Sequence, residues 1–221
     1  LRAVYNTAIE QKCVNPQSYP FRNYKVSKLH QQTAKRALTK TDINTLINYK
    51  ATTYREQFSI DLFTFSYLAG GINFVDIALL TNNNIANNQL VYTRKKTSKL
   101  IKLPIHPTAQ SIIEKYSNPN NPYLFPILSS YHITEQQKAN RVHKIISKTN
   151  ECLKSIGEKL KLPIPLTTYV ARHSFATVLK RSGVQTSIIS ESLGHSSEKV
   201  TQIYLDSFEN SQLNKALDNL L

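Results

Sequence analysis

The segment from Leu166 to Leu205 constrains the fold more than any other part of the sequence. Its apolar residues recur at helical spacing as far as Gly183, a residue type that commonly ends an α-helix. A second, shorter helix is expected to begin with Thr186 as its cap and to end at Gly194. Arg172 falls inside the apolar pattern of the first helix, where an unpaired cation would be costly. We therefore expect Arg172 to be buried with a dedicated partner.

The rest of the chain predicts a mainly α-helical domain of the α+β type, with one small antiparallel β-sheet. Two β-rich runs at 89–94 and 100–105 flank a basic turn and predict a hairpin. Thr134 and Gln137 fit a capping box, which predicts a long helix after them. Further helices are expected over residues 1–11, after an N-cap at Thr41-Asp42, and over 58–69, 74–80 and 107–116.

The charge of the chain indicates a polyanionic partner. Its 28 basic and 14 acidic residues give a formal net charge of +14, typical of proteins that bind nucleic acid. Residues 1–40 hold eight of the basic residues against Glu10 alone, which predicts a DNA-contacting segment or linker. A basic surface that is merely solvated is the alternative.

Other features exclude several classes of protein. No apolar run approaches the roughly 20 residues that span a bilayer, and no secretory signal is present. Cys13 and Cys152 lie far apart without metal-ligand spacing, which predicts reduced thiols in a cytoplasmic protein, nucleoid-associated when bound to DNA. The chain has no methionine, so we expect Leu1 not to be a native start and the sequence to be a piece of a longer protein.

Three polar residues in the 166–205 segment are the types needed to attack a phosphodiester with a phenol. Arg172 can clamp phosphate oxygens with its planar fork, His195 follows a turn glycine, and Tyr204 lies nine residues later. Each also has a structural reading: an arginine paired with a buried carboxylate, a histidine that satisfies helix carbonyls, and a core tyrosine. A free phenol has a pKa near 10, so Tyr204 needs a base or positive charge nearby to react.

These three residues, together with the turn Leu193-Gly194-His195, resemble the signature of the tyrosine recombinases, or phage-type integrases. The pattern is most similar to integrases of conjugative transposons and related mobile elements, and it extends from about Thr33 to the C-terminus. The resemblance implies the helical DNA breaking–rejoining fold. It also implies two parts: residues 1–36 as the end of a core-binding domain with a basic linker, and residues 37–221 as the catalytic domain.

The resemblance also implies a site-specific DNA recombinase. Tyr204 would attack the phosphorus, form a 3′-phosphotyrosyl link and release a 5′-hydroxyl, with no ATP, metal ion or other cofactor. Arg172 would hold the scissile phosphate, and His195 would be either a ligand to a phosphate oxygen or the acceptor of the phenol proton. Lys96 at the hairpin tip matches the general acid, with Lys95 as the neighbouring alternative.

Tyr169 is expected in the active site as well, where most members of the family carry histidine. Its phenol can still donate a hydrogen bond to a phosphate oxygen. A basic stripe at 138–148 is either a solvated helix face or a DNA contact. The residues expected to bind DNA are Arg94, Lys95, Lys99, His173, Arg141 and Lys144.

One departure from the family pattern puts the activity in question. The segment 70–78 resembles the motif of the first catalytic arginine, with Gly70 at the position expected to hold that residue. Loss of one such donor costs about 10²–10³ in rate, and Arg94, on the same strand face as Lys96, is the best surrogate. The alternatives are a catalytically impaired DNA-binding or regulatory module and, ranked last, an enzyme that relaxes DNA like a type IB topoisomerase.

The resemblance further implies assembly on double-stranded DNA. A homotetramer would integrate and excise a mobile element through paired strand exchanges. The amphipathic segment 208–221 is expected to form a helix. It would either dock on its own domain or be exchanged with a neighbouring protomer on DNA.

Overall fold

The computed structural model describes residues 1–22, 36–195, 198–202 and 205. The chain divides into two compact units, residues 1–35 and residues 36–221. This division lies within a residue of the boundary expected from the sequence. The origin of the first unit in a core-binding domain stays a prediction.

The first unit contains a helix and a short 3-10 turn. Helix α1 (Arg2–Glu10) follows the predicted range, and η1 (Pro16–Ser18) begins with a proline and is capped by the side chain of Asn15. Tyr5, Tyr19 and Phe21 form a small aromatic cluster, with ring centroids between 5.6 and 6.5 Å apart. The helix buries none of its own residues, so this cluster is the main packing within residues 1–22, the described part of the unit.

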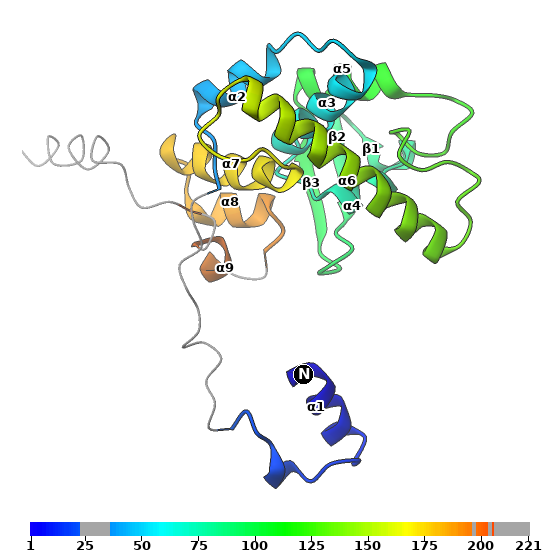
Figure 1. The fold of residues 1–221 in the computed structure, drawn as a ribbon, viewed down its shortest axis with the longest axis vertical. Helices are drawn as coiled ribbons and strands as arrows, with labels where there is room; N and C mark the ends of the chain where they lie inside the picture. The colour runs from blue at the N-terminus through cyan, green and yellow to red at the C-terminus, as the bar shows by residue number, and fades with distance from the viewer. Residues whose placement is uncertain (23–35, 196–197, 203–204, 206–221) are drawn as a thin grey trace, which may run out of the picture. The chain divides into compact units, whose positions relative to one another are not determined.

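The second unit is a set of helices around a small sheet (Figure 1). Its central helix is α3, which packs against α2, α5, α6 and α7. This arrangement confirms the mainly α fold with a small antiparallel sheet. The helices are α2 (Lys40–Ile47), α3 (Tyr54–Leu68), α4 (Phe74–Leu79), α5 (Pro107–Tyr116), α6 (Glu135–Lys159), α7 (Thr168–Arg181), α8 (Thr186–Ser192) and α9 (Glu198–Gln202), with a 3-10 turn η3 (Asn82–Asn84).

Capping side chains fix where four of these helices, α2, α3, α5 and α6, begin. The predicted capping box of α6 is confirmed, with Thr134 accepting from the backbone N–H of Gln137 and Gln137 reaching back. The predicted start of α2 was wrong, because Thr39 is the cap and Asp42 completes a capping box from the third helical position. Thr186 is likewise not a cap; it is the first residue of α8.

The sheet has three antiparallel strands in the order β1 (Ile85–Ala86), β2 (Gln89–Thr93) and β3 (Leu100–Pro104). The predicted hairpin is β2–β3, with Leu90 opposite Leu103 and Tyr92 opposite Ile101. Strand β1 was not predicted, since two residues are too few to show an alternating pattern. The loop between β2 and β3, which carries the basic residues, projects from the body of the unit (Figure 1).

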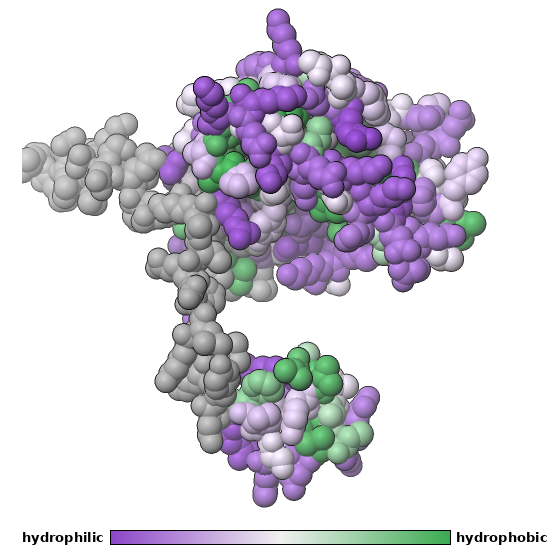
Figure 2. Space-filling model, viewed as in Figure 1, coloured by the Kyte–Doolittle hydropathy of each residue, from purple (hydrophilic) through white to green (hydrophobic). Residues whose placement is uncertain are grey.

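Two main cores stabilise the second unit. One lies among α3, α4, α5, the sheet and the start of α6, and the other joins α2 and α3 to α6 and α7. Hydrophilic residues dominate the face of this unit shown in Figure 2. None of the helices in the described ranges is long and apolar enough to cross a membrane.

Candidate active site

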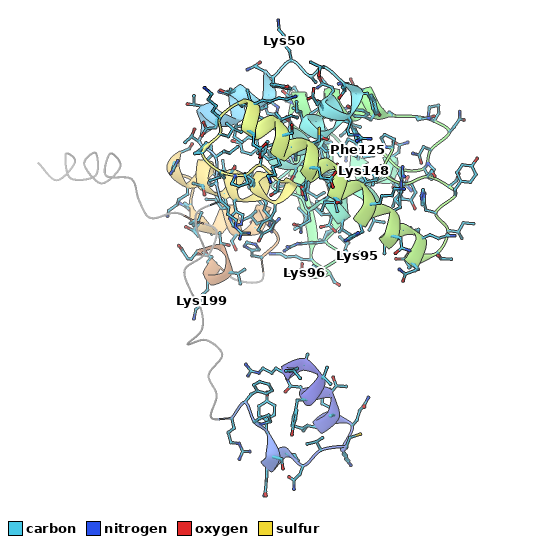
Figure 3. All side chains as sticks on the ribbon, viewed as in Figure 1. Lys50, Lys95, Lys96, Phe125, Lys148 and Lys199 are labelled. Atoms are coloured by element: carbon cyan, nitrogen blue, oxygen red, sulfur yellow. The ribbon has the colours of Figure 1, made fainter. Side chains whose placement is uncertain are left out.

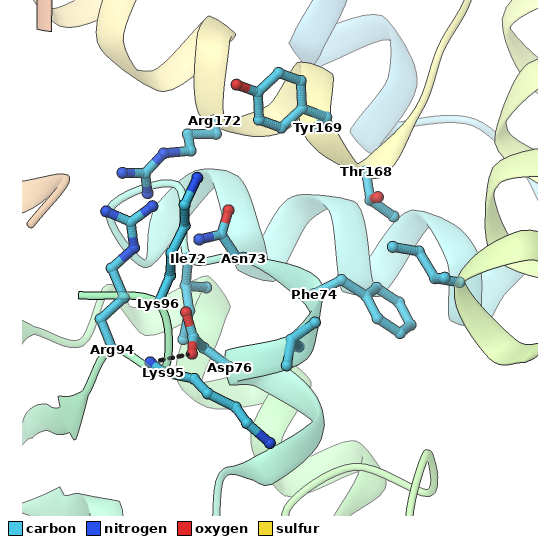
Figure 4. Close-up of a pocket in the computed structure, with 12 residues that line it drawn as sticks. Ile72, Asn73, Phe74, Asp76, Arg94, Lys95, Lys96, Thr168, Tyr169 and Arg172 are labelled. Atoms are coloured by element: carbon cyan, nitrogen blue, oxygen red, sulfur yellow. Dashed lines mark hydrogen bonds between the residues drawn. The ribbon is translucent and has the colours of Figure 1, made fainter. Parts of the chain in front are cut away.

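A pocket of about 400 Å³ lies where α4, the β2–β3 hairpin, α6 and α7 meet. Figure 4 shows the residues that line it. The polar and charged side chains in the lining come from elements far apart in the sequence, so only the tertiary structure assembles them. They are Asn73, Asp76, Arg94, Lys95, Lys96, Thr168, Tyr169 and Arg172.

Arg172 is buried at the inner end of this pocket, with 2% of its surface exposed. Its Nη1 donates to the carbonyl oxygen of Gly71 at 2.8 Å, and its Nη2 donates to the carbonyl oxygen of Leu193. A Cβ atom on Gly71 would lie 2.9 Å from the Cα of Arg172. Gly71 therefore permits the close approach of its backbone to α7, which places the guanidinium at the turn after α8.

His195 lies on that turn and contacts Arg172 directly. Its ring is 5% exposed, and its Nε2 is 3.1 Å from Nη2 of Arg172. Gly194 takes a left-handed conformation with φ of +65°, and the backbone N–H of His195 closes the helix end on the carbonyl of Ser190. Burial first, and then the charges of Arg172, Arg94 and Lys99, lower the pKa of His195 to about 4. The imidazole is thus neutral at physiological pH.

The two hairpin lysines point in different directions. The ammonium group of Lys96 is directed toward Arg172 and Asn73 (Figure 4), whereas Lys95 forms an exposed ion pair with Glu135 at 3.2 Å. The backbone N–H of Lys95 donates to Asp76 at 2.9 Å, which ties the hairpin to α4. Both lysines lie at the tip of the hairpin (Figure 3), and Lys96 is the one directed toward Arg172.

Arg94 is almost as buried as Arg172, with 6% of its surface exposed. Its Nη1 donates to the carbonyl oxygen of Gly194 at 3.2 Å, and Lys99 donates to the carbonyl oxygen of His195 at 3.0 Å. The guanidinium groups of Arg94 and Arg172 therefore reach the same turn from opposite elements, the hairpin and α7. A second arginine is present beside the first, as the surrogate hypothesis requires.

Gly70, the position expected to hold the missing arginine, lies outside the pocket lining. A Cβ atom on Gly70 would lie 2.4 Å from Cδ1 of Leu103 and 3.0 Å from the carbonyl oxygen of Ser192. The motif contributes two polar residues to the lining, Asn73 and Asp76. The amide side chain of Asn73, three residues after Gly70, faces the cavity (Figure 4).

Sequence reasoning missed Asn73 because it reads as an ordinary helix cap. It does occupy the N-cap position of α4, but its side chain makes no capping hydrogen bond. Asparagine is preferred at this position because its side chain can accept from the first turn of the helix. Here the amide is directed instead to the cavity that contains Lys96 and Arg172.

The remaining predicted residues occupy varied places. Tyr169 lines the pocket, is 42% exposed and contacts the ring of His173 edge-on, with centroids 4.7 Å apart. Arg141 donates to the carbonyl oxygen of Ile127, and Lys144 is exposed on the same helix α6. Neither lines the pocket. Tyr204 and the segment 208–221 lie outside the described residues.

A family model described as "Phage integrase family" matches residues 36–211. Tyrosine recombinase XerA of Pyrococcus horikoshii is 35% identical over 125 residues, which cover 55% of this chain and 40% of XerA. Tyrosine recombinase XerD of Bifidobacterium longum is 40% identical over 67 residues, 29% of this chain and 22% of XerD. The matched regions thus span less than half of these relatives.

Solved structures share the fold. The Tn1549 transposon integrase, bound to circular intermediate DNA, superposes with a TM-score of 0.68 at 16% identity, covering all of this chain and 76% of that one. A crystal structure of XerA recombinase gives a TM-score of 0.60 at 17% identity, covering 99% and 73%. These likenesses confirm the expected helical fold.

Proposed function

The chain belongs to the phage integrase family, the tyrosine recombinases, and we propose that it contains the catalytic part of a site-specific DNA recombinase. Double-stranded DNA is its substrate, cut and rejoined through a covalent bond between Tyr204 and a 3′-phosphate. The approach of Arg172 and Lys96 to one small pocket, with His195 in direct contact with Arg172, carries the proposal. The net charge of +14 supports a polyanionic substrate.

The pocket is suited to one phosphodiester group. Arg172 and Arg94 provide two fixed guanidinium groups at its inner end, and each can donate two parallel hydrogen bonds to phosphate oxygens. Asn73 adds an amide donor from a third direction. Preorganised donors of this kind stabilise the extra charge on the equatorial oxygens as the phosphorus becomes five-coordinate. In this role Arg94 compensates for the asparagine at position 73.

The reaction then needs a nucleophile and an acid. The phenol oxygen of Tyr204 loses its proton and bonds to the phosphorus, and the bond from phosphorus to the 5′-oxygen breaks. Lys96, on the tip of the hairpin, gives its proton to the leaving oxygen. The phosphotyrosyl bond retains the energy of the broken one, so attack by a new 5′-hydroxyl reseals the DNA without ATP.

The biological setting is the mobility of a DNA element. The likeness in fold to the integrase of a transposon supports this assignment, as does the resemblance of the 166–205 segment to integrases of such elements. A tetramer on DNA would pair two sites and exchange strands in turn. Exchange of the segment 208–221 between protomers would link this assembly to the position of Tyr204.

A nicked suicide substrate tests the proposal. A nick close to the cleavage site lets the released fragment diffuse away, so that the covalent complex accumulates. The expected result is a protein–DNA adduct that survives denaturation and is absent for Tyr204→Phe. Since the target site is not fixed by the sequence, the substrates are the end sequences of the element that encodes the chain.

The second candidate is a DNA-binding module without catalysis, favoured by the asparagine at position 73. It predicts salt-sensitive DNA binding and no adduct on the same substrate, even at high protein concentration. A topoisomerase-like activity predicts instead that the protein relaxes supercoiled plasmid as a monomer. The three outcomes are distinct in one set of reactions.

A further inference from the structure

The ring of His195 has a second hydrogen-bond partner on the side away from Arg172. Its Nδ1 lies 2.8 Å from Oγ1 of Thr201, a residue of α9 with none of its surface exposed. The two ring nitrogens of His195 therefore link α7 to α9. Nε2 contacts Arg172 of α7, and Nδ1 contacts Thr201 of α9.

The partners decide which nitrogen carries the proton of the neutral ring. A guanidinium group has donors and no acceptor, so Nε2 must accept the hydrogen bond from Nη2 of Arg172. The single ring proton is then on Nδ1, which donates to the hydroxyl oxygen of Thr201. The opposite tautomer would set two donors against each other at 3.1 Å.

We propose that Thr201 is a positioning residue that holds His195 in the Nδ1–H tautomer and so keeps Nε2 as a hydrogen-bond acceptor in the active site. The inference rests on the proposed function, because it assigns one of two roles to a residue of that site. Threonine suits the task, since its hydroxyl accepts the Nδ1 proton while its methyl group packs in the interior.

The charge state of the ring supports this assignment. Burial and the neighbouring cations lower the pKa of His195 to about 4, so the ring is neutral and has one acceptor nitrogen at physiological pH. The hydrogen bond made by one ring nitrogen of a histidine sets the protonation of the other.

This tautomer selects between the two roles that the sequence left open for His195. An unprotonated Nε2 cannot donate to a phosphate oxygen, but it can accept the proton of a phenol. When a phosphate oxygen accepts the Nη2 hydrogen of Arg172 in place of the ring, Nε2 becomes available, and the proton of the Tyr204 hydroxyl moves to it as the phenol oxygen bonds to phosphorus. Thr201 precedes Tyr204 by only three residues in the sequence.

Nitrogen-15 NMR of the imidazole rings of the 221-residue chain tests the tautomer directly. The His195 signals, one set among six histidines, are identified by their loss in His195→Gln. We expect a protonated shift for Nδ1 and an unprotonated shift for Nε2 in the wild type. Thr201→Val, which keeps the shape and removes the hydroxyl, should give averaged shifts, and Thr201→Ser should restore the wild-type pattern.

Adduct formation on the suicide substrate provides the second readout. Thr201→Val should slow cleavage by roughly 10- to 100-fold, part of the 10²–10⁴ that a general base contributes, with rescue by Thr201→Ser. Thr64→Val is the matched control, because Thr64 is also buried but its hydroxyl makes no hydrogen bond. Its cleavage rate and its His195 shifts should equal those of the wild type.

An Nε2–H tautomer in the wild type, or unchanged His195 shifts in Thr201→Val, would overturn the inference about Thr201. Both results are obtained without DNA, so they leave the proposed function standing. The absence of any adduct from a wild-type chain with the expected shifts would overturn the proposed function alone. If Thr201→Val does not fold, mixed tautomers or the absence of rescue in Thr201→Ser would count against the inference.

Discussion

The carboxylate oxygen Oδ1 of Asp76 accepts a hydrogen bond from the backbone N–H of Lys95 at 2.9 Å. This bond joins α4 to the hairpin that carries Lys96. Asp76 is itself buried in α4, so the helix holds this hydrogen bond, the anchor of the hairpin, in place. The side chain of Lys95 meanwhile turns away to the exposed Glu135. The hydrogen bond to the backbone of Lys95 thus helps to fix the direction of the Lys96 side chain.

The first prediction concerns this anchor. Asp76→Ala should lower the cleavage rate by about 10- to 100-fold, because a small displacement of a catalytic group has effects of this size. Asp76→Asn, which keeps an acceptor oxygen, should lose less. Glu135→Gln is the control, since it breaks only the exposed ion pair of Lys95; an equal loss in this variant would contradict the role given to Asp76.

The second prediction concerns Arg94 as the replacement for the missing arginine. Arg94→Ala should reduce adduct formation by about 10²–10³, the cost of removing one preorganised donor to the transition state. Lys99→Ala removes the other hairpin cation that holds the 194–195 turn, and it should have a much smaller effect. If Arg94→Ala cleaves at the wild-type rate while Lys96→Ala is inactive, the surrogate hypothesis fails.

The third prediction concerns Asn73. Asn73→Ala should slow cleavage by about tenfold, the loss of one hydrogen bond to a charged group. Asn73→Arg would place a guanidinium at the mouth of the same pocket, and we expect it to restore most of the activity of Arg94→Ala. If the double variant Asn73→Arg/Arg94→Ala binds the nicked DNA normally but cleaves no faster than Arg94→Ala, residues 73 and 94 do not contact the same phosphate.

The fourth prediction concerns acid stability. Glu56 accepts hydrogen bonds from Lys159 and from the backbone and hydroxyl of Thr52, and these lower the pKa of its carboxyl to about 2. A carboxyl whose pKa is lower in the folded state stabilises the fold above its unfolded pKa, near 4.5, and loses this contribution as the pH falls toward 2. Glu56→Gln should therefore lower the Tm by a few degrees at pH 7 and by progressively less below pH 4.5.

Thermal unfolding followed by circular dichroism from pH 7 to pH 2.5 provides the measurement. The control is Glu158→Gln, which removes an exposed pair with Lys154 at 4.0 Å and should change little at any pH, as is usual for surface pairs. A Tm difference between Glu56→Gln and the wild type that stays constant with pH would contradict the assignment.

Local pattern alone determined much of this protein. The hairpin, the capping box at Thr134, the helix end at Gly183 and a buried Arg172 followed from propensity and spacing, because each depends on residues within a few positions of one another. The family could also be identified from the spacing of a few side chains between 166 and 205. The role of Tyr204 remains a prediction of this kind.

Only the tertiary structure decided how the site is composed. The different directions of Lys96 and Lys95 depend on a bond to Asp76, nineteen residues away, and Asn73 rather than Gly70 lines the pocket because Gly70 packs where an added Cβ would meet Leu103 and Ser192. Arg94 is buried only because the hairpin packs on the turn at Gly194, one hundred residues later. Sequence periodicity gives the face on which a side chain lies. The partner that this face meets is set by long-range packing, which no local pattern contains.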